Sequence, residues 1–429
     1  AQVACVAVLL VPFLTTLDPR AAVKGSRDPL GAQVIWTRLG RNVVTNLTTV
    51  TTSANDFNTL LLGIYFAQRL DAGAAQPEVF LRWEQVAAYS RIKYGIPGGP
   101  ALRGVERVRR NLEGASRVDI SAHSVDQILS DQKMYGLWGL YLGAARASGF
   151  IEEDAVRLTP AADAYVTSAF GDVLEHRTAI MNLVRQERSK LHLESKHSNL
   201  CVTVGKALSQ IPQGLREPLW NALVANEHSS NVEQRQLAKL LEDPETLTDD
   251  EFSRAFVLRL QSAAQSHGYD ELRRRIERII ACESVLAPAS AALGFILSCN
   301  RLLVADIVDS LNEQWSDGSH IQLDVFRTLG EEIGTAVSSA EVNDLWQRAA
   351  ACLRECNYDL LIRALVDINR LVMRSRGGAP WIEIKAERLE VNIPGEGSAL
   401  PDKDALPELW RYPYFLHSIQ SIAWQLKAG

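Results

Sequence analysis

Four basic residues lie close together along the chain and are of the type that binds nucleic-acid phosphates. Three of them are arginines at helical spacing, so a helix would present them on one face, where guanidinium groups can pair with phosphate oxygens. The neighbouring acidic residues Glu106 and Glu113 leave open the alternative of an ordinary solvated helix face. The candidate phosphate-binding residues are Lys93, Arg103, Arg107 and Arg110.

A second candidate site is an aromatic segment near the end of the sequence. Large apolar side chains gathered in this way have to be buried, either in the chain's own core or against another protein. A short helix follows, with apolar residues at helical spacing from Leu416 to Leu426. The candidate partner-binding residues are Trp410, Tyr412, Tyr414 and Phe415.

The segment Glu383-Ile-Lys385 is the one catalytic pattern of interest. Residues two apart on a strand share a face, so the carboxylate could hold Mg²⁺ while the lysine steadies an attacking water, as in restriction-type nuclease cores. Such a core also needs an acidic residue on a neighbouring strand, whereas Asp359 and Asp367 fall in sequence with helical spacing. A Mg²⁺-dependent nuclease is therefore the alternative function.

Other catalytic patterns are absent from the sequence. It holds no phosphate-cradling Gly-rich loop, no G-x-S-x-G nucleophile elbow and no H-E-x-x-H zinc motif. His192 and His197 are its densest histidine pair, but at that spacing a helix would point them to different sides. We therefore expect no metal ligand, no cofactor and, outside the nuclease alternative, no catalytic residue.

The elements that must position these residues are mainly helices. Residues 158 to about 367 show helical spacing nearly throughout, with capping boxes that place helix starts at Thr248 and Ser338. After a Gly- and Pro-containing break at 374–380, alternating apolar residues predict a C-terminal β-hairpin. The predicted fold class is mainly α with a small β component, in several domains.

One stretch resembles a known family. A helix that ends at Gly149 is followed by a Phe150-Ile151 strand, an acidic Glu152-Glu-Asp154 turn and Arg157-Leu-Thr-Pro160, which opens a further helix. This order is similar to the end of a winged-helix domain, and the helices upstream would complete a module over about 80–170. The resemblance implies duplex DNA binding, with one helix in the major groove and the wing on the backbone.

The sequence departs from that family at two points. A helix in the recognition position would offer only Lys133 and Arg146 among apolar residues. The wing turn is acidic where phosphate binding needs lysine or arginine. A scaffold or protein-binding use of the winged-helix-like module is therefore favoured, with duplex DNA as a second candidate ligand.

These breaks predict four ranges along the chain. Residues 1–72 form an N-terminal segment, whose apolar run from Val3 to Leu14 would be a buried strand or short helix. Residues 73–170 form the winged-helix-like module, 171–376 a helical region, and 377–429 the β-hairpin with an amphipathic helix.

Composition limits the function classes. The chain has 429 residues, of which 47% are hydrophobic and 22% charged, which is typical of a folded globular protein and excludes a disordered or collagen-like one. A net charge of -6 gives no general attraction for nucleic acid, so any such binding needs a local basic patch. Six cysteines without a C-x-x-C pair, and no long uninterrupted apolar run, predict a cytoplasmic protein without membrane contact.

The sequence thus predicts a non-catalytic subunit of a bacterial multi-protein complex that binds a protein partner, with DNA as a further ligand. A winged-helix-like part embedded among other helices is also similar to uncharacterised proteins of bacterial phage-defence clusters. That similarity implies a role in antiviral defence.

Overall fold

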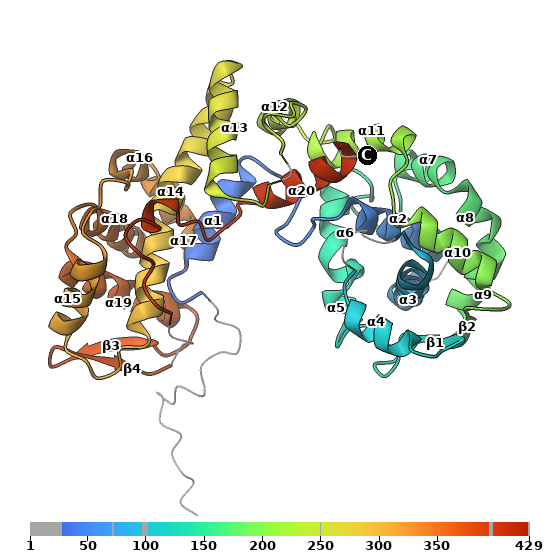
Figure 1. Ribbon diagram of the computed structural model, residues 1–429, viewed down its shortest axis with the longest axis horizontal. Coiled ribbons are helices and arrows are strands. Elements are labelled where there is room, and N and C mark those ends of the chain that lie inside the picture. Colours follow the sequence, from blue (N-terminus) through green and yellow to red (C-terminus); the bar gives the residue numbers. More distant parts are fainter. Residues whose placement is uncertain (1–27, 71–72, 97–101, 249, 394–397, 428–429) are drawn as a thin grey trace, which may run out of the picture. The chain divides into compact units, whose positions relative to one another are not determined.

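The computed structural model describes residues 28–70, 73–96, 102–248, 250–393 and 398–427 (Figure 1). Helices contain 61% of the residues and strands 5%. The predicted fold class, mainly α with a C-terminal hairpin, is therefore confirmed. The strand or helix predicted from Val3 to Leu14 lies outside the described residues.

The chain divides into two compact units, each assembled from separate stretches of sequence. Unit 1 comprises Ala1–Leu39 and Glu277–Tyr412, and unit 2 comprises Gly40–Ile276 and Pro413–Gly429. The finer division into 1–72, 73–170, 171–376 and 377–429 stays a prediction.

Unit 1 is a helical layer with one β-hairpin. Helix α18 packs on α19 and on the shorter α16 and α17, while α15 and the hairpin pack against α19. Its elements are α1 (Ala32–Arg41, to Leu39 in this unit), α14 (Asp270–Ile296, from Glu277), α15 (Val304–Gln314), α16 (Leu323–Arg327), α17 (Gly330–Val337), α18 (Ala340–Arg354), α19 (Tyr358–Ser375), β3 (Ile382–Lys385), β4 (Arg388–Val391) and a 3-10 turn at Leu406–Glu408.

Helix α14 is the longest described helix. By length and composition it could cross a membrane, but 78% of its most apolar 18-residue window is buried inside the protein. Such burial is typical of the core helix of a globular fold.

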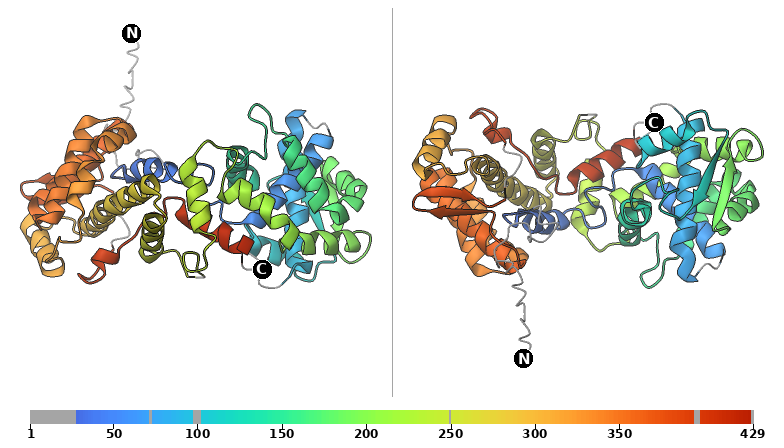
Figure 2. Two further views of the ribbon diagram at one scale, coloured as in Figure 1. Left: turned by 90° about the horizontal axis from the view of Figure 1, so that it is seen from above. Right: turned by 90° about the horizontal axis from the view of Figure 1, so that it is seen from below.

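The hairpin β3–β4 lies along α19 (Figure 2). Ile382 pairs with Val391 and Lys385 with Arg388, and Ile382 is fully buried. The two turn residues between the strands, Ala386 and Glu387, both adopt positive φ angles of 50° and 57°. This left-handed turn matches the twist of the two strands but costs free energy for residues other than glycine or asparagine.

Unit 2 is arranged around α3, which lies among the other helices of this unit (Figure 1). Its elements are α2 (Ala54–Arg69), α3 (Gln76–Tyr94), α4 (Val105–Leu112), β1 (Arg117–Ser121), α5 (Gln132–Tyr135), α6 (Leu137–Ala147), α7 (Pro160–Ala169), α8 (Gly171–Glu175), α9 (Arg177–Arg185), β2 (Arg188–His192), α10 (Ser198–Ala207), α11 (Arg216–Leu219), a π-helical turn (Trp220–Val224), α12 (Val232–Leu240), α13 (Arg254–Ser266), the first residues of α14, α20 (Leu416–Lys427) and 3-10 turns at Gly73–Ala75 and Gln213–Leu215.

Close packing of α2 on α3 depends on a glycine. A Cβ atom at Gly63 would lie 2.5 Å from ring atoms of both Phe80 and Trp83, which is too close for any side chain. Trp83 also donates its indole N–H to the Thr59 carbonyl of α2 at 2.8 Å. The two helices are therefore held by a tight aromatic contact and a buried hydrogen bond.

Residues 158 to about 367 were predicted to be helical nearly throughout, and this prediction is wrong at Arg188–His192, which forms strand β2. β2 pairs antiparallel with β1, so that Arg117 lies opposite His192 and Ser121 opposite Arg188. In the stretch that resembles a winged-helix domain, Ile151 and Leu158 meet in an isolated bridge and Thr159 caps α7. β1 pairs with β2 and not with this bridge.

Both predicted helix starts differ from the observed ones. α13 begins at Arg254, after Ser253, and not at Thr248. α18 begins one residue later than predicted, because Ser339 and not Ser338 accepts a hydrogen bond from the Val342 N–H, at 3.3 Å. Ser338 instead ends α17 with a left-handed φ of 52°.

The β3–β4 turn gives a testable prediction. We expect Ala386→Asn to stabilise unit 1 by about 0.5–1 kcal/mol, because asparagine tolerates the left-handed backbone better than alanine. Thermal unfolding of the full chain measures this as an upward shift of the transition. Ala405→Asn is the matched control, since Ala405 is also exposed but has a φ of -84°. An equal shift in both variants would refute the backbone explanation.

Candidate functional site

Most of the predicted phosphate-binding residues are engaged within the protein. Lys93 pairs with the carboxylate of Glu194 at 2.6 Å. Arg107 donates from Nη1 to the carbonyl oxygens of Gln127 and Leu129 at 2.8 and 3.1 Å. Both side chains therefore hold loops of unit 2 in place.

Arg103 and Arg110 differ in their surroundings. Arg103 reaches the Val50 carbonyl at 3.5 Å and lines a cavity of about 370 Å³ together with Asp56 and Tyr141. Arg110 is exposed on α4, and its side chain makes no hydrogen bond or ion pair with the described residues. Of the four predicted residues, Arg110 is the one best placed to meet an external phosphate.

The β1–β2 ribbon places further cations beside α4, which contacts β1 (Figure 1). Alternate ribbon residues are buried, and the outward positions include Arg117 and Lys190, both exposed and without an ion pair among the described residues. Asp119 lies on the same side, opposite Lys190. Arg188, in contrast, lies 3.5 and 3.3 Å from carboxylate oxygens of Asp119 and Asp126. We call Arg110, Arg117 and Lys190 the α4–ribbon face.

The sequence did not indicate this face, because β2 lies within the segment assigned to helices. The signal that could have found it is the alternation in Arg188-Ser-Lys-Leu-His192, where Ser189 and Leu191 are buried and their neighbours are more exposed.

Unit 2 also contains a buried ion pair between α2 and α3. Arg91 Nη1 lies 2.9 Å from Asp56 Oδ1, and both side chains are only 4% exposed. The Tyr141 hydroxyl lies 3.4 Å from Asp56 Oδ2. Burial, and then the charge of Asp56, raise the pKa of Tyr141, so its hydroxyl stays protonated and can donate to the carboxylate.

Glu84 on α3 is the most strongly perturbed acid of this region. Its two carboxylate oxygens accept hydrogen bonds from the Leu137 backbone N–H at 2.7 Å and from Gln132 Nε2 at 2.8 Å. Burial raises the pKa of Glu84 to about 7, and Asp56 adds to the shift while the two hydrogen bonds oppose it. Glu84 therefore fixes the start of α6 and titrates near neutral pH.

The prediction that His192 and His197 point to different sides is wrong, because His192 lies on β2 and not on a helix, and the two ring centroids are 5.7 Å apart. The His192 backbone N–H donates to Nδ1 of His197 at 3.1 Å, which occupies that ring nitrogen. Among the described residues, no group of three or more His, Cys, Asp or Glu side chains is placed to hold a metal ion.

The aromatic segment is used inside the protein. In unit 1, Tyr412 stacks on Trp36 with ring centroids 5.0 Å apart, and Trp410 Nε1 donates to the Tyr412 carbonyl at 2.6 Å. In unit 2, Tyr414 is completely buried and Phe415 is 3% exposed. Packing inside units 1 and 2 thus accounts for the apolar character of this segment, and no partner protein is needed to explain it.

The candidate nuclease residues lie on β3 beside α19. Lys385 Nζ is 3.3 Å from Glu383 and 2.5 Å from Glu390, and these pairings raise the pKa of Lys385. Asp367, which the sequence placed on a helix, lines the same cavity of about 460 Å³ as Glu383 and Lys385. Asp367 also pairs with Arg370 at 2.8 Å.

No model of a protein family, no curated protein and no solved structure matches this chain.

The Glu84 geometry predicts a pH-dependent stability. Its pKa is about 7 in the folded protein and 4.5 ordinarily, so the folded state binds more protons between these values. The stabilisation is complete below pH 4.5 and is lost as pH rises to about 7. We expect the free energy of unfolding to fall by up to roughly 3 kcal/mol across this window.

Chemical denaturation of wild type and Glu84→Gln at several pH values measures this contribution. In Glu84→Gln the free energy of unfolding should no longer fall between pH 4.5 and about 7. Glu78 is an exposed acid on the same helix, so Glu78→Gln should keep this fall. An unchanged slope in Glu84→Gln would show that another group is responsible.

Proposed function

We propose that this chain is a non-catalytic subunit of a bacterial multi-protein assembly and that it binds duplex nucleic acid through the α4–ribbon face. The observation that carries the proposal is the meeting of two basic segments far apart in sequence, α4 and β2, on either side of β1. Cations spread over a helix and a ribbon can contact successive phosphates, whereas paired or buried arginines cannot.

The contact proposed here differs from that of a winged-helix domain. α6 stands where that resemblance puts the recognition helix, and the positions it exposes most include Gly139 and Gly143. Glycines offer no side chain for base edges, and Arg146 donates to the Glu152 carbonyl at 3.0 Å. We infer phosphate binding with little sequence preference, and a scaffold role for the winged-helix-like part.

A protein partner is the second half of the proposal. Met134 and Tyr135, neighbours on the short helix α5, are 57% and 52% exposed. Exposed methionine and tyrosine are enriched in protein interfaces. Membership of an assembly is supported by this exposure, while a role in phage defence rests on the resemblance alone.

The α4–ribbon face predicts the effect of removing three charges. We expect the combined variant Arg110→Gln, Arg117→Gln and Lys190→Gln to bind duplex DNA at least about tenfold more weakly. The slope of log affinity against log salt should fall by roughly 2–3, since each phosphate contact contributes about 0.9. Fluorescence anisotropy with a labelled duplex at several salt concentrations measures both quantities.

A matched triple variant controls for net charge. Arg177, Lys206 and Lys239 are also exposed cations of unit 2 and lie outside this face, so their change to glutamine should leave the salt slope nearly unaltered. Equal losses in the two triple variants, or no loss in the first, would overturn the assignment of this face.

A nuclease remains a second candidate, favoured by the shared cavity of Glu383, Lys385 and Asp367. This function predicts Mg²⁺-dependent cleavage of plasmid DNA that Glu383→Gln abolishes. Glu313→Gln, an exposed acid on α15, should leave cleavage unchanged. Cleavage that survives Glu383→Gln would remove the assignment.

A further inference from the structure

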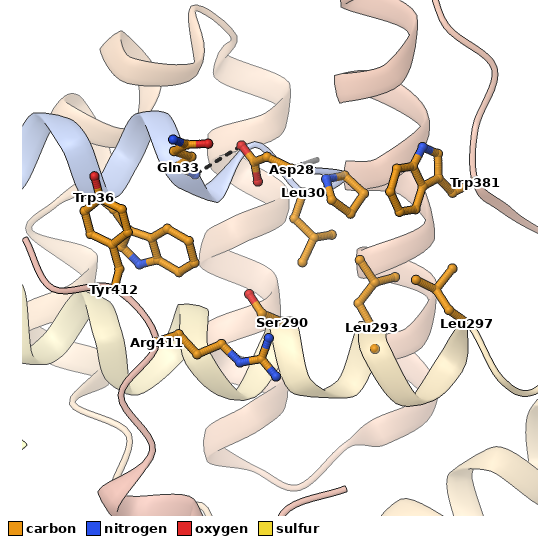
Figure 3. Close-up of a pocket in the computed structure, with 12 residues that line it drawn as sticks. Asp28, Leu30, Gln33, Trp36, Ser290, Leu293, Leu297, Trp381, Arg411 and Tyr412 are labelled. Atoms are coloured by element: carbon orange, nitrogen blue, oxygen red, sulfur yellow. Dashed lines mark hydrogen bonds between the residues drawn. The ribbon is translucent and has the colours of Figure 1, made fainter. Parts of the chain in front are cut away.

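Unit 1 contains a cavity of about 410 Å³ between α1, α14 and the segment before Pro413 (Figure 3). Its volume is in the range of pockets that hold small organic molecules. The lining residues used in the argument are Leu30, Trp36, Leu293, Leu297, Trp381 and Arg411.

Most of the wall is apolar and firmly held. Leu30, Leu293 and Leu297 are at most 8% exposed, so the cavity lies against the packed core of α14. The Trp36 ring is fixed by its parallel stack on Tyr412, and the Trp381 backbone N–H donates to Asn369 Oδ1 at 2.8 Å. A wall of this kind favours an apolar ligand and needs little rearrangement to accept one.

One end of the cavity carries a cation without a direct partner. Figure 3 shows the Arg411 side chain extending along α14, with its guanidinium beside Ser290. Its guanidinium makes no hydrogen bond or ion pair with the described residues, and burial lowers its pKa, a shift that the nearby charge of Glu283 partly opposes. Glu283 instead accepts the backbone N–H groups of Arg411 and Tyr412, which holds this segment in place.

The Asp28 carboxylate, which also lines the cavity, already has partners within the protein. The Asp28 carboxylate accepts N–H groups from Ala32 and Gln33 at 2.9 and 3.1 Å and lies 3.3 Å from the guanidinium of Arg376. The indole nitrogen atoms of Trp36 and Trp381 are buried away from this space, although they have no hydrogen-bond partner among the described residues. The guanidinium of Arg411 is therefore the available donor among these groups, and it suits a ligand that supplies an acceptor.

We propose that this cavity binds a small apolar molecule that carries one carboxylate. The apolar part lies against Leu30, Leu293 and Leu297, and the carboxylate pairs with the guanidinium of Arg411. The site is independent of the nucleic-acid-binding proposal, because it lies wholly within unit 1.

The experiment is calorimetric titration of the full chain with octanoate, 1-octanol and octylammonium, which share an apolar tail and differ in charge. We expect octanoate to bind most tightly. Arg411→Gln should weaken octanoate at least about tenfold and leave 1-octanol nearly unchanged, because only the carboxylate gains a charge-assisted hydrogen bond. Arg327→Gln, an exposed arginine elsewhere in unit 1, should change neither affinity.

A second variant tests the apolar part of the site. Ser290 lines the cavity and is partly exposed, so Ser290→Phe should fill the space and weaken octanoate and 1-octanol together. A thermal melt of each variant checks that it folds. Octanoate that binds no tighter than octylammonium, equal octanoate affinity in Arg411→Gln and wild type, or no binding of octanoate up to about 1 mM would each overturn the proposal.

Discussion

The arrangement of unit 2 depends on one constraint, which is that α3 is buried on nearly all sides and still carries charged and amide side chains. Each of these groups needs a partner, since an unpaired buried charge costs several kcal/mol. The partners come from different elements. Arg82 donates to a carbonyl of α9, Glu84 accepts from α5 and from the start of α6, Gln85 exchanges hydrogen bonds with β1, and Arg91 pairs with α2. The hydrogen bonds and the ion pair that these side chains of α3 require therefore fix the positions of the elements around it.

This constraint also decides which basic residues remain available for binding. β1 is held against α3 through Gln85, and β2 then pairs with β1, which carries Lys190 to the outside beside Arg117. Arg107 is drawn inward because the carbonyl groups of the loop before α5 need donors. The charges that define the α4–ribbon face are thus those that the buried polar network does not use.

Patterns among neighbouring residues predicted the local structure. They could not predict contacts between segments that are far apart in the sequence. The hairpin β3–β4 follows from alternation, and the start of α7 follows from Thr159 and Pro160, because each depends on neighbouring residues alone. β2 was missed because its partner strand is about seventy residues away and the alternation in its five residues is too short to outweigh the helical spacing on either side. The cavity beside Arg411 could not be predicted from the sequence, because its walls come from segments that are far apart in the chain.

A net charge of -6 does not oppose a phosphate-binding surface of only a few cations. At physiological salt the Debye length is about 8 Å, so a phosphate at the α4–ribbon face senses the charges beside it and little of the rest. Three unpaired cations are, however, few by the standard of DNA-binding proteins, which commonly make about 6–10 phosphate contacts. The face alone would then bind weakly and lose affinity steeply with salt. Weak, non-specific affinity becomes useful when a partner holds the protein near the nucleic acid, because linked binding events raise the effective concentration. The small size of the face is therefore an argument for a subunit that acts within an assembly, and against a protein that finds DNA by itself.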